Sequence, residues 1–401
     1  MKIAVVGVKG IPAQQGGIEH YCQELYRNIA IQGHSVDLYA RSDYTKVDGF
    51  SSYMCHGVKV ISLPSLPLEG LDTLFNSFIA TVASTIKKYD IVHFHALGPS
   101  LFCWLPRSLS SAKIVVTCHG LDWQRSKWSK IARAIIYSGE KMAVANADRL
   151  IVVSQYLQSY FQKKYGIKPT YIPTAPAEYA DSDASLAYIS SLGLKPQKYV
   201  IFLGRLVPEK RPELLLEAFK VLDPEDWKLV FVGDTSGTDY FKSKLVKSKN
   251  DKIIFTNTLT GSILAETLRN AGLFVLPSDL EGLPLVVLEA MREGIPVLAS
   301  DIPPHQQLVG RDRGILFKAG NLDSLITNLQ QILSQPEELE NKVKKAKEYI
   351  QANYSWQRVG YENLVLYTKL SKLLSNKNQE KIANKIVVLG ESKFESPDNN
   401  Q

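Results

Sequence analysis

The stretch "KIAVVGVKGIPAQQGGIEHYCQEL" (residues 2–25) begins with a short apolar run, passes through a glycine-rich loop and ends in apolar residues at helical spacing. This order of strand, loop and helix is the start of a β-α-β unit. The loop holds Gly10, Gly16 and Gly17 but does not match the GxGxxG fingerprint of dinucleotide-binding proteins. The free backbone amides at the start of a helix can bind a phosphate, and glycines let the phosphate approach the backbone closely. A flexible turn explains the same glycines equally well.

The same alternation of strand-length apolar runs and helical patterns continues along the chain, and nearly continuous runs of Val, Ile and Leu are typical of parallel strands covered on both faces. In the first half these runs are 35–40, 90–96, 113–119, 149–154 and 170–174. In the second half they are 199–204, 228–233, 252–257, 273–278, 296–300 and 314–317. The pattern predicts an α/β protein with two Rossmann-like, doubly wound parallel sheets that face a central cleft.

A polar, proline-bearing stretch, "TAPAEYADSDASLAYISS" (174–191), separates the two sets of strands and is typical of a domain boundary. We therefore expect an N-terminal domain over residues 1–176 and a C-terminal domain over 177–354. A helix over about 355–374, with Ser355 as its N-cap, is expected to complete the first domain. Residues 375–401 are mostly polar and are expected to form a mobile tail.

Composition points to an ordinary soluble globular protein, with 45% hydrophobic and 22% charged residues among 401. The four cysteines show no CxxC or metal-like spacing, which favours free thiols in a reducing, cytoplasmic compartment. No run reaches the roughly 18 apolar residues of a membrane span. The net charge of +7 fits nucleic acid, an anionic membrane or phosphorylated small molecules. Because no nucleic-acid-binding motif accompanies that charge, no nucleic-acid partner is expected.

Two stretches that follow strands of the second half carry candidate chemistry. In "LGRLVPEKR" (203–211), Arg205 and Lys210 suit a diphosphate, although solvated surface charges are the ordinary explanation for such a pair. In "PSDLEGLPLVVLEAMREG" (277–294), Glu281 precedes a helix and Glu289 lies about two turns further on. A carboxylate there can accept hydrogen bonds from a ribose diol or can simply interact with the helix dipole.

Five motifs together resemble the family-four retaining glycosyltransferases with the GT-B fold. They are "GIPAQQGGIEHY" (10–21), "HFHALGP" (93–99), "VVTCHGLDWQRSKW" (115–128), "GRLVPEK" (204–210) and "PSDLEGLPLVVLEAM" (277–291). The second and third motifs resemble the branch found in bacterial polysaccharide and cell-surface sugar assembly. The similarity extends from residue 1 to about residue 374. One departure is the "TAP" at 174–176, where many relatives have an Asn-Gly turn, and it puts the linker geometry in doubt.

This resemblance implies a retaining transfer from a nucleotide-diphosphate sugar to a glycan or lipid-linked acceptor. It implies catalytic roles for Glu281, which faces the donor sugar, and for His119, which lies near the reacting carbon. It assigns donor binding to Gly16, Gly17, Arg205, Lys210, Gly282, Leu283 and Glu289. Within that set the basic pair holds the diphosphate, the glycine loop closes on the same phosphates and Glu289 holds the ribose.

No metal or other cofactor is expected. His93 and His95 lack a third partner at metal spacing, so packing or an acceptor-site role is favoured for both. The only Asp-x-Asp pattern near the candidate motifs, Asp181 to Asp183, lies in the linker and is more simply a solvated turn. Positive charge from Arg205 and Lys210 can stabilise the leaving phosphate without a divalent ion.

The acceptor is expected on the first domain, where "LDWQRSKWSKIARAII" (121–136) combines two tryptophans with basic residues that include Arg125 and Arg133. Its apolar residues from Trp128 recur at helical spacing, which fits peripheral contact with the inner face of an anionic membrane or a core-facing amphipathic helix. Two other functions remain open. One is a nucleotide-sugar epimerase of the same fold, and the other is a non-catalytic binding or scaffold protein.

Overall fold

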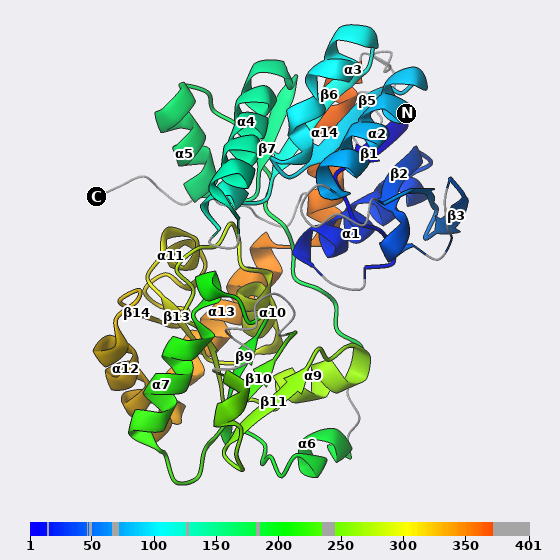
Figure 1. Cartoon of the computed structure of the whole chain (residues 1–401). Helices are drawn as coiled ribbons and strands as arrows, with labels where there is room; N and C mark the ends of the chain where they lie inside the picture. The colour runs from blue at the N-terminus through cyan, green and yellow to red at the C-terminus, as the bar shows by residue number, and fades with distance from the viewer. Residues whose placement is uncertain are drawn as a thin grey trace.

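The computed structural model describes residues 1–13, 16–45, 47, 50–65, 72–125, 128–181, 185–234 and 245–371. These residues form two α/β halves, one above the other in Figure 1, and each is built around its own sheet. The predicted fold class is confirmed.

The sheet of the first half has the order β3-β4-β2-β1-β5-β6-β7-β8. Its strands are β1 (Lys2–Val6), β2 (Ser35–Arg41), β3 (Ser52–Cys55), β4 (Val58–Leu63), β5 (Ile91–His95), β6 (Lys113–Cys118), β7 (Arg149–Val152) and β8 (Thr170–Tyr171). Its longer helices are α1 (Gly17–Ile31), α2 (Asp72–Ile86), α3 (Trp104–Leu109), α4 (Lys130–Asn146) and α5 (Gln155–Tyr165). Short 3₁₀ turns lie at η1 (Ser42–Tyr44), η2 (Pro99–Phe102) and η3 (Asp122–Gln124).

Strands β3 and β4 form an antiparallel edge hairpin that the sequence did not predict. The turn between them uses left-handed backbone at His56 and Gly57, where φ is 49° and 81°. Every residue of β3 is exposed or only partly buried, because β3 is the outermost strand of the sheet. An edge strand of this kind has no continuous apolar run, which was the pattern used to find the other strands.

The sheet of the second half is entirely parallel, with the order β11-β10-β9-β12-β13-β14. Its strands are β9 (Tyr199–Leu203), β10 (Lys228–Val232), β11 (Ile253–Asn257), β12 (Leu273–Leu276), β13 (Val297–Ser300) and β14 (Ile315–Phe317). Its helices are α6 (Ala187–Ser191), α7 (Pro212–Leu222), α9 (Gly261–Arg269), α10 (Leu285–Glu293), α11 (Pro303–Val309), α12 (Leu322–Ser334) and α13 (Glu340–Asn353). Its 3₁₀ turns are η4 (Pro208–Lys210), η5 (Val246–Ser248) and η6 (Pro336–Leu339).

In both sheets the order in which successive strands are added reverses at the first strand. β1 lies between β2 and β5, and β9 lies between β10 and β12, so the chain builds outward on one side and then crosses to the other. Ligands of open parallel sheets bind beyond the carboxyl ends of the strands at such a switch point. The loops after β1, β5, β9 and β12 are therefore the places where the fold positions a site.

The last described helix, α14 (Trp356–Ser371), returns to the first half and packs against α1. In Figure 1 it is the orange helix that lies among the blue and cyan elements. Ser355 caps it as predicted, because its hydroxyl accepts a hydrogen bond from the Arg358 amide at 3.2 Å. The Trp356 indole N–H donates to the Pro176 carbonyl at 3.0 Å and so ties α14 to the start of the linker. Residues 372–401, which include the predicted tail, lie outside the described residues.

Within the described part of the chain, no helix combines the length and the apolar character needed to cross a membrane.

Candidate active site

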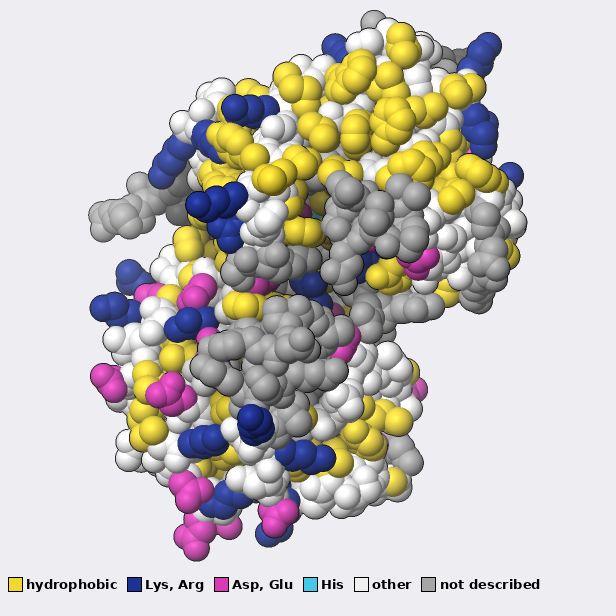
Figure 2. All heavy atoms as spheres, viewed as in Figure 1, with side chains coloured by type: hydrophobic (Ala, Val, Ile, Leu, Met, Phe, Trp, Pro, Cys, Tyr) yellow, Lys and Arg dark blue, Asp and Glu magenta, His cyan; other side chains and the backbone are white. Residues whose placement is uncertain are grey.

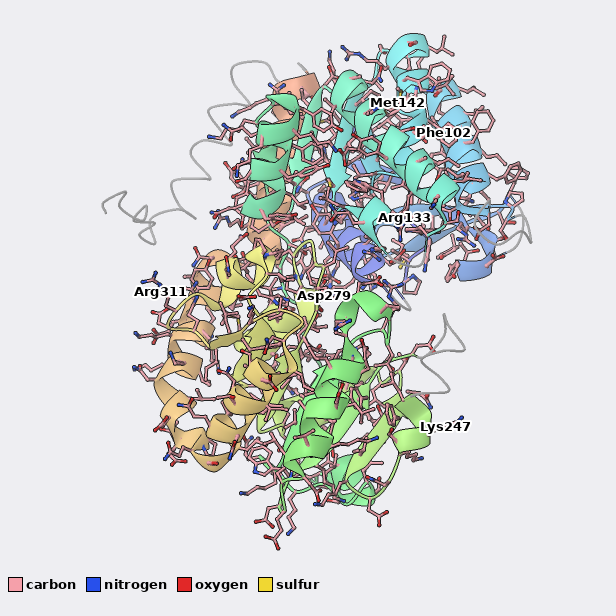
Figure 3. All side chains as sticks on the ribbon, turned by 60° about the vertical axis from the view of Figure 1, so that its left-hand side comes forward. Phe102, Arg133, Met142, Lys247, Asp279 and Arg311 are labelled. Atoms are coloured by element: carbon pink, nitrogen blue, oxygen red, sulfur yellow. The ribbon has the colours of Figure 1, made fainter. Side chains whose placement is uncertain are left out.

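A cavity lies between the two halves, at the carboxyl ends of both sheets. Figure 3 labels Arg133 and Asp279 on the facing sides of this junction. The lining residues come from both halves: Gly120, Leu121, Arg125, Arg205, Glu209, Lys210, Leu280, Glu281 and Gly282. Four of the residues that the sequence predicted for donor binding or catalysis therefore share one cavity: Arg205, Lys210, Glu281 and Gly282.

An ion pair joins the two predicted motifs of the second half. The Lys210 ammonium lies 3.0 Å from a Glu281 carboxylate oxygen, with 16% and 14% of the two side chains exposed. η4 follows β9 and the Glu281 loop follows β12, so the pair forms across the switch point of the sheet. Burial by itself would raise the pKa of Glu281, but Lys210 and a 2.8 Å hydrogen bond donated by Ser278 hold that pKa below its ordinary value. Glu281 is therefore an anion at neutral pH.

Two guanidinium groups share this cavity. Loss of water and the neighbouring charge of Arg125 lower the pKa of Arg205, whereas Asp122, 3.0 Å from Arg125, raises the pKa of Arg125. Arg125 reaches the cavity from the loop between η3 and α4 on the first half. With Lys210, three cations from both halves converge on one cavity, an arrangement that suits an anion of several charges.

The sequence did not name Arg125 for donor binding. We expected this residue in the acceptor segment of the first half, whereas it lines the cavity together with Arg205 and Lys210. The reason is local, because the 3₁₀ turn over Asp122–Gln124 and the ion pair to Asp122 direct the guanidinium back toward the cleft. The positions of glycine and proline do not predict this turn. The spacing of three residues between Asp122 and Arg125 was a signal for their ion pair.

The two halves touch through glycine backbone. A Cβ added to Gly282 would overlap the carbonyl oxygen of His119, so only glycine permits this approach. Gly17 also faces the other half, because a Cβ there would lie 2.9 Å from the Leu285 side chain at the start of α10. Gly16 adopts φ of 99°, a conformation that favours glycine. The loop after β1 thus lies against the start of α10, although Gly16 and Gly17 are not among the residues that line the cavity.

His119 stands at the end of a buried chain of hydrogen-bonded rings. Its Nε2 lies 3.1 Å from Nδ1 of His95, and Nε2 of His95 lies 2.7 Å from the Tyr26 hydroxyl. The Tyr26 hydroxyl also lies 2.9 Å from Nδ1 of His93, which in turn is 2.6 Å from the Tyr367 hydroxyl of α14. Each ring nitrogen of the two inner histidines therefore has a partner.

These histidines are neutral at physiological pH. Burial lowers the pKa of His119 to about 3, and burial lowers the pKa of His93 and of His95 well below the ordinary value. His119 itself does not line the cavity through its ring, but its neighbour Gly120 does. The first half therefore presents a rigid, uncharged hydrogen-bonding group at the edge of the site.

Glu289 lies apart from the cavity. It is 7% exposed, and the Tyr179 hydroxyl from the linker donates a 2.7 Å hydrogen bond to it. Burial raises the pKa of Glu289 despite that hydrogen bond. Leu283 is also buried and does not line the cavity. The contact between Tyr179 and Glu289 joins residues 110 positions apart, so no local pattern could have predicted it.

Among the described residues, no group of three or more His, Cys, Asp or Glu side chains is arranged to hold a metal ion. The Asp-x-Asp pattern at 181–183 is described only at Asp181, because residues 182–184 lie outside the described residues. The four cysteines are free thiols, as predicted.

Comparison with known proteins agrees with this arrangement. The family model for glycosyltransferase family 4 matches residues 15–176, and the model for glycosyl transferases group 1 matches residues 188–349. The chain belongs to the family-four glycosyltransferases. Their GT-B fold accounts for the two facing sheets. The first matched segment contains Gly16 and Gly17, and the second contains the basic and acidic motifs.

Relatives of this glycosyltransferase span nearly its whole length. An uncharacterized glycosyltransferase of Methanocaldococcus jannaschii is 26% identical over 92% of this chain and 98% of its own. A D-inositol 3-phosphate glycosyltransferase of Rhodococcus opacus is 26% identical over 89% of this chain and 87% of its own.

Solved structures share the fold of this glycosyltransferase. Sucrose-phosphate synthase from Thermosynechococcus elongatus superposes with a TM-score of 0.77 at 23% identity, over 92% of this chain and 98% of the other. The Anabaena protein HepE, in complex with UDP and glucose, superposes with a TM-score of 0.73 at 16% identity, over 92% of this chain and 100% of the other.

Proposed function

We propose that this glycosyltransferase moves a sugar from a nucleoside-diphosphate sugar to a glycan or lipid-linked acceptor in the assembly of a polysaccharide or cell-surface glycan, with retention of configuration. The observation that carries the proposal is the convergence of Arg125, Arg205 and Lys210 on one cavity. A nucleoside diphosphate is the leaving group that three such cations would hold and stabilise. The HepE structures with UDP and with UDP-glucose support a donor of this class.

Cleavage of the bond between sugar and diphosphate builds negative charge on the phosphate and positive charge on the sugar ring. We propose that Arg205 and Lys210 stabilise the first charge and that the Glu281 carboxylate, which shares their cavity, stabilises the second. These fixed side chains supply the phosphate stabilisation, so we propose that transfer proceeds without a resident metal. Addition of EDTA at millimolar concentration should then leave the transfer rate unchanged.

We propose that configuration is retained because the acceptor attacks the sugar on the same face from which the diphosphate departs. In this proposal Glu281, whose Oε1 accepts from Lys210 at 3.0 Å and from Ser278 at 2.8 Å, acts through its negative charge and forms no bond to the sugar. We propose that the neutral His119 side chain exchanges hydrogen bonds with sugar hydroxyls. Because it carries no charge, it does not draw the phosphate away from the cations. Closure of the halves around the donor excludes water, which limits hydrolysis.

The test is a panel of UDP-, GDP-, dTDP- and ADP-sugars, scored first by thermal shift and then by nucleotide release with and without glycan or lipid-linked acceptors. We expect one donor to stabilise the protein, acceptor to stimulate release, and Lys210→Ala to abolish both. Lys252→Ala is the matched control, because Lys252 pairs with Asp223 on the surface of the same half. Interconversion of the donor sugar without an acceptor would identify an epimerase, and the absence of any shift would contradict the donor site.

A further inference from the structure

Helix α2 on the first half departs from the usual amphipathic pattern, although its Ile79 and Ala83 pack against the core. Its buried residues are small or polar: Asn76, Ser77, Ala80, Thr81 and Ser84. Phe78 and Ile86 on the same helix are 45% and 79% exposed. A helix on the surface of a globular protein normally directs its apolar side inward, so packing within this chain does not explain the outward side of α2.

The buried hydroxyls of α2 are satisfied by the helix itself. Ser77 donates to the Thr73 carbonyl at 2.6 Å, Thr81 donates to the Ser77 carbonyl at 2.6 Å, and Ser84 donates to the Thr81 carbonyl at 2.8 Å. Such back-bonding lets hydroxyl side chains face the protein interior without an unpaired polar group. These hydroxyls are thus paired within α2, whereas Nδ2 of the buried Asn76 has no hydrogen-bond partner among the described residues, and the exposed Phe78 and Ile86 are left for an external partner.

Exposed or partly exposed apolar side chains also occur on η2 and α3, which contact α2, and on α4, which contacts η2 and α3. The rings of Phe78 and Phe102 meet edge to face with centroids 5.4 Å apart. Trp104, Leu109 and Ile131 are 45%, 68% and 75% exposed. We name this surface the apolar platform, and we define it as the residues Phe78, Ile86, Phe102, Trp104, Leu109 and Ile131.

The figures show how this surface lies on the molecule. Figure 2 shows hydrophobic side chains spread across the upper half, where Figure 1 draws α2, α3 and α4. Figure 3 places Phe102 and Met142 in the outer part of the first half, whereas Arg133 lies nearer the cleft. None of the platform residues lines the cavity, but Ile131 belongs to the end of α4 that lies nearer the cleft and follows the loop that carries Arg125.

The exposed side-chain charges on and beside the apolar platform are mainly positive, and Asp148, just beyond α4, pairs with Arg107 of α3 at 2.7 Å. The only acidic residues in α2, η2, α3 and α4 are Asp72 and Glu140. Asp72 pairs with Arg41, and Glu140 is fully buried with Lys164 at 2.7 Å. The lysines exposed on or directly beside these helices are Lys87, Lys88, Lys130 and Lys141. A second copy of the chain would bring like charges together, whereas lipid phosphates complement them.

We propose that the apolar platform docks on the surface of an anionic phospholipid bilayer. Phe78, Leu109 and Ile131 would enter the boundary between head groups and acyl chains, and the half-exposed Trp104 suits that boundary because its ring is amphipathic. The lysines would lie at the level of the phosphates. This inference deepens the proposed function, because it favours a lipid-linked acceptor delivered from the same bilayer over a freely dissolved glycan.

Vesicle flotation with the full chain tests this docking. We expect the protein to float with vesicles of phosphatidylcholine and phosphatidylglycerol, to bind pure phosphatidylcholine more weakly, and to bind less at high salt. The double variant Phe78→Glu with Ile86→Glu should bind at least tenfold more weakly. The matched control, Val221→Glu with Ile263→Glu, alters side chains that are 63% and 42% exposed on the second half and should bind like wild type.

Charge reversal at the lysines separates the electrostatic contribution from the apolar one. Lys88→Glu and Lys141→Glu should each weaken binding to anionic vesicles by about fivefold or more at low salt. Equal vesicle binding by the Phe78 and Ile86 double variant and wild type would overturn the proposal. So would a concentration-dependent dimer that the double variant abolishes and that binds no vesicles, because the occupant would then be a second copy.

Nucleotide-sugar thermal shifts on the same samples keep this inference distinct from the proposed function. The platform variants should retain the wild-type shift, since their side chains do not line the cavity. Vesicle binding without any nucleotide-sugar shift would contradict the donor site and leave the docking surface supported. A nucleotide-sugar shift without binding to any vesicle would overturn the docking surface alone.

Discussion

The two sides of the cleft handle buried polar groups in opposite ways. The second half keeps its groups charged, with Lys210 and Glu281 paired at 3.0 Å and the pKa of Glu281 held below its ordinary value. The first half keeps its buried histidine rings neutral, because burial lowers the pKa of His93, His95 and His119, and among the cavity-lining residues it contributes one charged side chain, Arg125. The difference indicates a division of labour in which the charged side holds an anionic donor and the neutral side receives sugar hydroxyls.

The largest expected effect comes from breaking the charged side. Lys210→Ala removes a cation from the proposed diphosphate site and leaves Glu281 without its partner. We expect the transfer rate to fall by about 10²- to 10³-fold, because comparable losses follow removal of one preorganised donor at a developing negative charge. Steady-state kinetics on Lys210→Ala and on the Lys252→Ala control measure the effect. Equal rates for the two variants would show that Lys210 does not act on the donor.

The next effect comes from separating the two sides. Gly282→Ala places a methyl group against the His119 carbonyl, so the halves must move apart at the cavity. We expect at least a tenfold loss of transfer rate, because a small displacement of reacting groups is costly. Gly98→Ala is the control, since the nearest atom to a Cβ there is 3.9 Å away. Wild-type kinetics for Gly282→Ala would indicate that the closed contact is unimportant.

The buried histidines of the first half make the free energy of unfolding depend on pH. The folded-state pKa of His119 is about 3, below the ordinary histidine value near 6.5, so the unfolded chain binds more protons between these pH values. Stability is therefore intact above pH 6.5 and falls as the pH drops, by up to about 1.4 kcal/mol per pH unit for each buried histidine. Chemical denaturation at pH 7.5, 6.0 and 5.0 measures the slope. A slope that His119→Asn leaves unchanged would contradict the assignment.

The smallest effect is expected at the linker. Tyr179→Phe removes the hydrogen bond to Glu289 and leaves a buried carboxyl with one partner fewer. We expect a loss of about 1 kcal/mol in stability, the usual net value for one hydrogen bond. Nucleotide-sugar affinity should stay the same or rise, since Glu289 is then freer to accept a hydrogen bond from a ribose. Thermal denaturation and calorimetric titration measure the two effects, and a tenfold loss of affinity would assign Tyr179 to the donor site.

The sequence predicted those parts of the molecule that depend on local patterns. Continuous apolar runs located the strands of both sheets outside the β3 and β4 hairpin, and Arg205, Lys210 and Glu281 could be named because they follow strands at a switch point. Other features depend on contacts between distant residues. The chain of rings from Tyr367 to His119 joins α14 to β5 and the end of β6, and the outward face of α2 is defined only by what the helix packs against. Local periodicity contains neither kind of information.

Calorimetric titration of the stabilising nucleotide sugar into wild type, Lys210→Ala and His119→Ala tests the division between the two sides most directly. We expect Lys210→Ala to lose donor affinity. We expect His119→Ala to bind the donor with nearly wild-type affinity and, in the nucleotide-release assay with acceptor, to lose transfer. Loss of donor affinity in His119→Ala with retention in Lys210→Ala would contradict that division.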